Sequence, residues 1–169
     1  PVSIANGFSY IVFDKNGGTT TVSGATVSSI AYVGAFVGAS IPGLYKTTDG
    51  GVSFTKMGGT GSYQTSPTRA VVNNDGIFAG VFCANGGNGA VMTATRAATS
   101  LTEVAITNAG QPVNGIALSV DGKKIIATSA GPGYPVYSSN STVTTWTKRL
   151  MAVGLKIPYE DDDWCHQSI

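Results

Sequence analysis

A tight turn within residues 44–55 (LYKTTDGGVSFT) constrains the fold of this chain more than any other stretch. Asp49 can accept hydrogen bonds from the backbone N–H groups of its own turn. Gly50 and Gly51 supply the positive φ values that a connection between two strands needs. Phe54 can fold back against the sheet below. The pattern therefore predicts a β-hairpin whose turn is held by side chains.

Short runs of β-forming residues, separated by turn clusters, recur along the rest of the chain, and no helical periodicity competes with them. The expected strands are residues 7–13, 28–37, 43–46, 68–72, 77–83, 90–95, 101–106, 113–120, 124–129 and 136–137. Turns are expected at 14–18, 73–76 and 121–123, where Asp or Asn stands beside Gly. The sequence predicts an all-β protein.

Composition supports this fold class and excludes several functions. Charged residues make up 11% of the chain, 23 of its 169 residues are Gly, and the formal net charge is +1. The only run of like charge is 160–163, so no basic patch is available for nucleic acid. No stretch approaches the roughly 20 apolar residues of a membrane span. Such a composition is typical of secreted or extracellular β proteins.

The signals that bear on secretion leave alternatives open. Cys83 and Cys165 could form a disulfide across the fold or remain separate thiols. Asn140 begins an N-glycosylation sequon, which matters only in a eukaryotic secretory pathway. The chain starts at Pro1 without an initiator Met or a signal peptide, so we expect a processed protein or a piece of a larger one.

The strands group into three units of about 40–50 residues, the length of a four-stranded repeat. The units are residues 7–57, 63–106 and 112–150, and residues 151–169 begin a further strand or loop. The third unit repeats the turn of the first in degraded form, because Asn140 replaces Asp and the spacing to Trp146 is one residue longer. The whole chain is expected to form a single structural segment.

The turn resembles the Asp-box, the bacterial neuraminidase repeat that closes blade hairpins in sialidases, xyloglucanases and related β-propellers. The matching residues are Thr47, Asp49, Gly51, Ser53 and Phe54, with Ser138, Asn140 and Trp146 in the degraded copy. The resemblance implies a β-propeller segment of about three four-stranded blades. Because a ring needs at least about four blades, we expect either a fragment of a larger ring, which we favour, or several chains that complete one.

Residues 7–149 also resemble the middle blades of xyloglucanase-like glycoside hydrolases, whose two seven-bladed propellers clasp a β-glucan chain. That family places two catalytic aspartates in motifs before and after this region, and neither motif is present in the chain. No catalytic residue is therefore assigned. The loop 131–135 replaces a Trp-rich loop of the family, and Tyr134 could stack on a sugar there.

The candidate glycan-binding residues are Tyr134, Trp164 and Tyr63. Beside Trp164, the acidic run 160–163 could line a sugar subsite, bind Ca²⁺ or form a solvated loop, which is the reading that we favour. No cofactor or metal is expected, and His166 is the only histidine, so a His-based metal cluster or triad is excluded within this chain. The remaining acids are expected to be turn acceptors at Asp14, Asp75 and Asp121 and a solvated side chain at Glu103.

These observations favour a secreted carbohydrate-active β-propeller that supplies scaffold and part of a glycan-binding face to a β-glucan hydrolase. The expected partners are a polysaccharide or glycan and either further blades of the same protein or copies of the chain. The alternative is a non-enzymatic extracellular propeller with an adhesive, binding or structural-assembly role. A photosystem-assembly type of propeller is disfavoured, because its partners are membrane complexes and nothing in the sequence indicates them.

Overall fold

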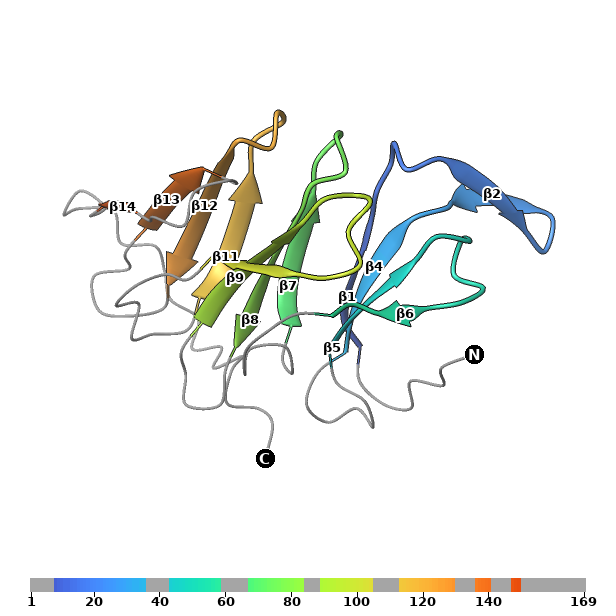
Figure 1. Cartoon of the computed structure of the whole chain (residues 1–169), viewed down its shortest axis with the longest axis horizontal. Coiled ribbons are helices and arrows are strands. Elements are labelled where there is room, and N and C mark those ends of the chain that lie inside the picture. The colour runs from blue at the N-terminus through green and yellow to red at the C-terminus, as the bar shows by residue number, and fades with distance from the viewer. Residues whose placement is uncertain are drawn as a thin grey trace, which may run out of the picture.

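The computed structural model describes residues 8–35, 43–58, 67–83, 89–104, 113–129, 136–140 and 147–149, and the regular structure there is entirely β (Figure 1). Three antiparallel sheets of four strands each, together with one two-stranded hairpin, make up these ranges. The prediction of an all-β fold is confirmed.

Each four-stranded sheet pairs its strands in the order in which they follow along the chain, although two strands of a separate hairpin stand between the first two strands of the first sheet. The first sheet contains β1 (Phe8–Phe13), β4 (Ala31–Ala35), β5 (Gly43–Thr47) and β6 (Thr55–Lys56). The second contains β7 (Pro67–Val72), β8 (Phe78–Cys83), β9 (Gly89–Ala94) and β10 (Thr102–Val104). The third contains β11 (Val113–Leu118), β12 (Lys124–Ser129), β13 (Val136–Asn140) and β14 (Thr147–Arg149). Each sheet lies within one of the three units read from the sequence.

The first hairpin of each sheet has the same construction. The first strand carries a register shift at an equivalent place, between Phe8 and Tyr10 in β1, Pro67 and Arg69 in β7, and Val113 and Gly115 in β11. A β-turn follows each first strand, in which a glycine N–H donates to a carbonyl three residues earlier. These bonds join Gly17 to Asp14 at 3.1 Å, Gly76 to Asn73 at 3.1 Å and Gly122 to Ser119 at 2.9 Å. The three sheets are thus repeats of one unit.

A short hairpin that the sequence analysis missed is inserted between β1 and β4. It consists of β2 (Thr19–Val22) and β3 (Ala25–Ser28). Its two-residue turn has φ values of 48° at Ser23 and 83° at Gly24, both in the left-handed region that such turns require. The expected strand 28–37 is wrong at its start, because Ser28 ends β3 and β4 begins only at Ala31. Residues 36–37 lie outside the described ranges.

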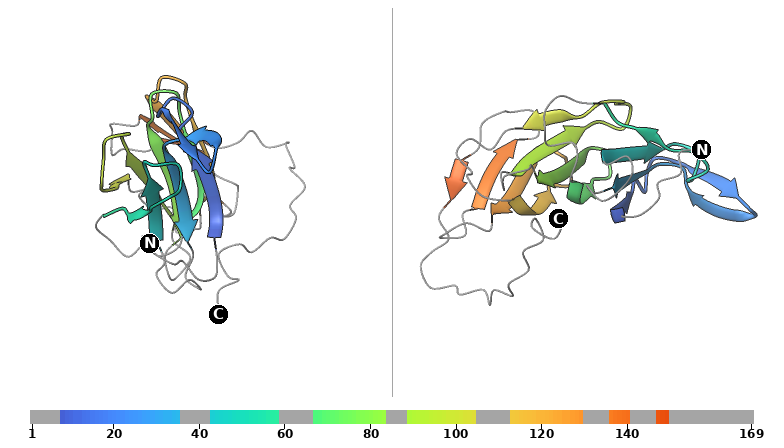
Figure 2. Two further views of the ribbon diagram at one scale, coloured as in Figure 1. Left: turned by 90° about the vertical axis from the view of Figure 1, so that its right-hand side faces the viewer. Right: turned by 90° about the horizontal axis from the view of Figure 1, so that it is seen from below.

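The sheets stack face to face in the order first, second, third, as the views in Figures 1 and 2 agree. Alternate residues of each strand face opposite sides, so the second sheet contributes to two apolar layers. Its Phe78 and Met92 pack toward the first sheet, against residues that include Tyr32 and Leu44. Its Val81 and Val91 pack toward the third sheet, against residues that include Val113 and Ile125.

Within the described ranges the row of sheets is open, because the first and third sheets each have one neighbouring sheet (Figure 2). The inserted hairpin projects from the first sheet at the end of the row away from the other two (Figure 1). No described segment is a helix long and apolar enough to span a membrane.

Candidate functional site

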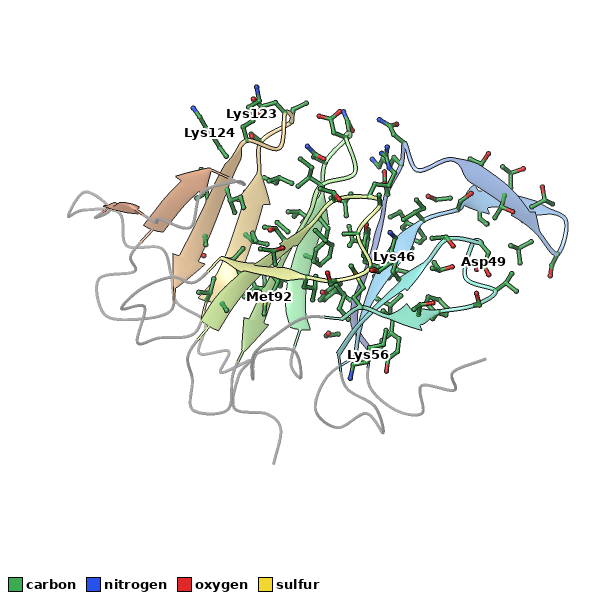
Figure 3. All side chains as sticks on the ribbon, viewed as in Figure 1. Lys46, Asp49, Lys56, Met92, Lys123 and Lys124 are labelled. Carbon is green, nitrogen blue, oxygen red and sulfur yellow. The ribbon has the colours of Figure 1, made fainter. Side chains whose placement is uncertain are left out.

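The turn between β5 and β6 is held by its own side chains, as the sequence predicts. The Asp49 carboxylate accepts hydrogen bonds from the Ser53 backbone N–H at 2.9 Å and the Ser53 hydroxyl at 2.6 Å. The Thr47 hydroxyl donates to the same carboxylate at 2.8 Å and accepts from the Gly51 N–H at 2.9 Å. The Asp49 carboxylate therefore connects the two sides of the turn through hydrogen bonds. Figure 3 shows Asp49 at the outer end of the first sheet.

The remaining expectations for this turn are also confirmed. Gly50 and Gly51 have φ values of 75° and 93°, so both adopt the conformation that favours glycine. Phe54 packs against a small apolar cluster on the outward face of the first sheet, which contains Val33 and Tyr45. The Phe54 ring of the turn thus covers part of the outward face of the first sheet.

The inserted hairpin rests on this turn. The Gly50 N–H donates to the Ser29 carbonyl at 3.0 Å. A β-carbon on Gly50 would lie 2.6 Å from a methyl of Thr20 and 2.7 Å from a methyl of Val27, so only glycine permits the contact. Gly51 has no such neighbour, because its nearest contact would be the Phe54 ring at 3.7 Å. The two glycines therefore have different tasks, since Gly50 allows close packing and Gly51 allows the bend.

We expect the replacement Asp49→Ala to destabilise the fold in a pH-dependent way. Hydrogen bonds from Ser53, followed by that from Thr47, lower the pKa of the Asp49 carboxyl to about 2. A lowered pKa gives stability that is present above the unfolded pKa of about 3.9 and is lost as the pH falls through the folded pKa. The variant should therefore melt about 3 °C below the wild type at pH 7, and the gap should close between pH 4 and pH 2.

Thermal unfolding followed by circular dichroism at several pH values measures this gap. The matched control is Thr48→Ala, in the same turn, whose side chain is exposed. A gap that stays constant from pH 7 to pH 2 would show that the ionised carboxylate does not stabilise the turn.

An ion pair between a buried carboxylate and a partly exposed guanidinium joins the first and second sheets, at the edge where the turn after each first strand lies. Asp14, directly after β1, is fully buried, and its carboxylate accepts from Arg96 Nε at 2.6 Å and from Arg96 Nη2 at 3.0 Å. Arg96 follows β9 and keeps a side-chain exposure of 35%. It also donates to the Asn74 carbonyl at 3.2 Å. A two-pronged guanidinium contact of this kind fixes the orientation of both groups.

Asp14 thus does more than the sequence analysis expected. It accepts from the Asn16 N–H at 3.2 Å, as a turn acceptor does, and it also binds a residue of the next sheet. Gly76 packs directly against this ion pair. A β-carbon there would lie 2.7 Å from the Asp14 carboxylate and 2.5 Å from Arg96 Nε. Its φ of 75° also favours glycine.

Lys46 and Tyr32 make further contacts between these two sheets. The Lys46 ammonium donates to the backbone carbonyls of Arg96 and, at 3.2 Å, Ala98. It also lies 5.8 Å from the centre of the Tyr32 ring, a cation–π distance. Burial lowers the pKa of Lys46, and the charge of Asp14 opposes that shift. Burial raises the pKa of Tyr32 to about 12, and its hydroxyl has no hydrogen-bond partner among the described residues.

At the equivalent place between the second and third sheets, a hydrogen bond from the side-chain amide of Asn73 replaces the ion pair. Asn73, directly after β7, donates from its side chain to the Val120 carbonyl at 3.0 Å and accepts from the Ile77 N–H at 2.8 Å. A β-carbon on Gly122 would lie 2.7 Å from the Asn73 amide nitrogen. In both joints, a polar side chain at the start of one turn packs on the glycine of the next sheet's turn.

All three candidate glycan-binding residues, Tyr134, Trp164 and Tyr63, lie outside the described ranges, as do Trp146 and the acidic tail. Ser138 and Asn140 belong to β13, for which only the backbone is described. The structure therefore brings together the turn residues of the first Asp-box-like motif and leaves the sugar-binding prediction untested.

The described carboxylates are mostly engaged in structural hydrogen bonds. Asp121 accepts from the Ser119 hydroxyl at 2.6 Å and the Lys123 N–H at 3.1 Å, as expected for a turn acceptor. Asp14 and Asp49 are bound as described above. Among the described residues, no group of three or more His, Cys, Asp or Glu side chains could hold a metal ion. In the described ranges, these carboxylates thus stabilise turns and a contact between two sheets.

Sequence reasoning missed Arg96, Asn73 and Lys46 as inter-sheet residues. A usable signal existed for Asn73, because it begins a turn at the position that Asp14 occupies in the first unit. Arg96 stands 82 residues from Asp14, and no local pattern links the two.

Comparison with models of known protein families and with curated proteins gave no match for this chain.

Proposed function

We propose that the three sheets are successive blades of a β-propeller and that the chain is the scaffold and glycan-binding part of a secreted, xyloglucanase-like β-glucan hydrolase. The observation that carries the proposal is the position of the Asp49 turn, between the third and fourth strands of the first sheet. The repeated construction of the three sheets supports a blade architecture, since propellers repeat four-stranded antiparallel units.

The carbohydrate part of the proposal rests on the sequence resemblance and on the aromatic residues Tyr134, Trp164 and Tyr63. Aromatic rings bind sugars by stacking on their C–H faces, and this requires no ionisable group. The resemblance places the hydrolytic carboxylates in other blades, so this chain is expected to bind without cleaving.

Isothermal titration of the purified chain with a panel of soluble glycans tests this function. We expect binding to xyloglucan oligosaccharides and at least a tenfold loss of affinity in Tyr134→Ala or Trp164→Ala, with a smaller loss in Tyr63→Ala. The control is Phe13→Ala, which removes an aromatic ring that is 50% exposed on the outward face of β1. The absence of binding to every β-glucan in the panel would overturn the proposal.

A second candidate is the non-enzymatic assembly role, in which the chain acts through its own surfaces. Apolar side chains exposed on the two outer sheets favour it, since monomeric proteins seldom expose such groups together. Ile11 and Phe13 are 54% and 50% exposed on β1, and Ile126 is 47% exposed on β12.

A further inference from the structure

The first strand of each sheet contains one extra residue at its second position. In β1, Phe8 and Tyr10 pair with consecutive residues of β4, so Ser9 between them is the extra residue of a β-bulge. The register shifts in β7 and β11 leave Thr68 and Asn114 in the same way. Bulges of this kind are frequent next to functional sites, where they redirect a side chain. The three bulges are therefore one repeated feature that can be compared between sheets.

The extra residue is polar in every sheet, although the strands that contain it are mostly apolar. The strands read FSYIVF in β1, PTRAVV in β7 and VNGIAL in β11. A bulge bends its strand through the backbone, so the bend itself does not require a hydroxyl or an amide. Ser9 is exposed, and its hydroxyl also donates to the Gly34 carbonyl at 3.2 Å. The repeated polar residue thus indicates a role beyond the shape of the strand.

The three bulges lie along one rim of the row of sheets. β1 is the neighbour of β7, and β7 is the neighbour of β11. In Figure 1 these strands start at the lower side of the molecule, and the turns that follow them lie at the upper side. We call the positions of Ser9, Thr68 and Asn114 the bulged rim. It is opposite to the turns in which Asp14 and Asn73 connect the sheets.

Arg69 stands directly after the bulge of the middle strand. It is the only charged residue of the three first strands, and its side chain is exposed. It makes no hydrogen bond or ion pair with a described residue. The described aspartates lie in turns at the other side of the row, at Asp14, Asp49, Asp75 and Asp121. The Arg69 guanidinium can therefore donate to oxygen atoms of a ligand.

The bulged rim is also where the chain returns from two segments that contain sequence-derived glycan candidates. β7 starts at Pro67, four residues after Tyr63, and β13 starts at Val136, two residues after Tyr134. β13 runs in the same direction as β11, because both pair antiparallel with β12. Both β7 and β13 thus start on the side of the bulged rim. The aromatic candidates and the polar bulge positions are connected to the same side of the sheets.

We propose that the bulged rim is a glycan-binding subsite, in which Ser9, Thr68, Asn114 and Arg69 hydrogen-bond the hydroxyl groups of a glycan chain lying across the three first strands. Three equivalent polar positions in a row match a ligand that is itself a repeating polymer. The inference rests on the proposed function, because it adds polar contacts to the stacking expected of the tyrosines. In ligand sites a few polar groups fix the orientation of the ligand and give specificity.

An NMR titration of the 169-residue chain with xyloglucan oligosaccharides locates the contact. We expect the backbone amide signals of residues 8–10, 68–70 and 113–115 to shift as the ligand is added. The signals of the turns 49–53 and 119–122 should stay unchanged, because these turns lie on the opposite side. Shifts confined to parts of the chain away from the bulged rim would contradict the proposal.

Calorimetric titration of variants tests the side chains. Thr68→Val removes a hydroxyl and keeps the side-chain shape, and we expect it to weaken binding about fivefold, as should Ser9→Ala and Asn114→Ala. Arg69→Met should weaken binding about tenfold, because it removes a charged donor. Thr21→Val is the matched control, since it removes an exposed threonine hydroxyl from the inserted hairpin. Circular dichroism establishes that each variant remains folded.

A glycan panel that adds mannans and uronic-acid polysaccharides to the β-glucans separates this inference from the proposed function. Binding of a β-glucan that is unchanged in all four rim variants would overturn the rim and leave the function in place. Binding only of glycans other than β-glucans, weakened in the rim variants, would overturn the function and support the rim. A chain that binds no glycan of the panel would overturn both.

Discussion

Replacing Arg96 by methionine should lower the midpoint of thermal unfolding by about 10 °C. The Asp14 carboxylate has no exposed surface, and Arg96 supplies both of its contacts from the second sheet. Removing the guanidinium leaves a buried charge without a counter-ion, which is among the costliest changes that a single substitution makes. Methionine keeps most of the side-chain volume, so the loss reports on charge more than on packing.

A double variant identifies the unpaired charge as the cause. Asp14→Asn combined with Arg96→Met removes both charges, and we expect it to recover at least half of the lost midpoint. Arg69→Met is the control, because Arg69 lies exposed on β7. If the double variant is no more stable than Arg96→Met alone, the ion pair is not what holds the sheets together at this edge.

Replacing Gly76 by alanine should lower the midpoint by a similar amount, again about 10 °C. A β-carbon at this position would lie 2.5 Å from Arg96 Nε and 2.7 Å from the Asp14 carboxylate, so the ion pair must separate to admit it. The φ of 75° adds the strain that alanine suffers in the left-handed region. Both effects act on the same joint between the first two sheets.

Gly24 provides the matched control for the backbone part of this loss. Its φ is 83°, and a β-carbon there would meet nothing within 4 Å. Gly24→Ala should therefore cost only the conformational strain, about 3 °C. Equal losses in the two variants would rule out the steric explanation. In the Arg96→Met background, Gly76→Ala should cost less than in the wild type, because one side of the clash is gone.

How well the sequence predicted the structure depends on how local each interaction is. The Asp49 turn was predictable, because Thr47 and Ser53 both donate hydrogen bonds to Asp49 within the short stretch 47–53. The inserted hairpin was also local, and its β-branched Thr and Val residues on both sides of Ser23 and Gly24 were a signal that the sequence analysis missed. The strand expected at 28–37 absorbed the end of that hairpin.

The joints between the sheets could not be predicted in the same way. Asp14 and Arg96 are far apart in the chain, and each has an ordinary local interpretation as a turn residue or an exposed base. They meet only because β1 and β7 pack side by side and bring their turns to one edge. Burial of Asp14 is thus a property of the stacked sheets that no single segment encodes.

The joint at the turn edge also bears on how such a chain can evolve. Each joint needs one polar side chain at the start of a turn and one glycine at its end, and a single sheet carries both. A gene duplication that copies one sheet would therefore copy both the polar side chain and the glycine, which are the groups needed for contact with the following and the preceding sheet. Asn73 stands at the position equivalent to the charged Asp14, so two such units can differ in the chemistry of this contact while keeping the same geometry.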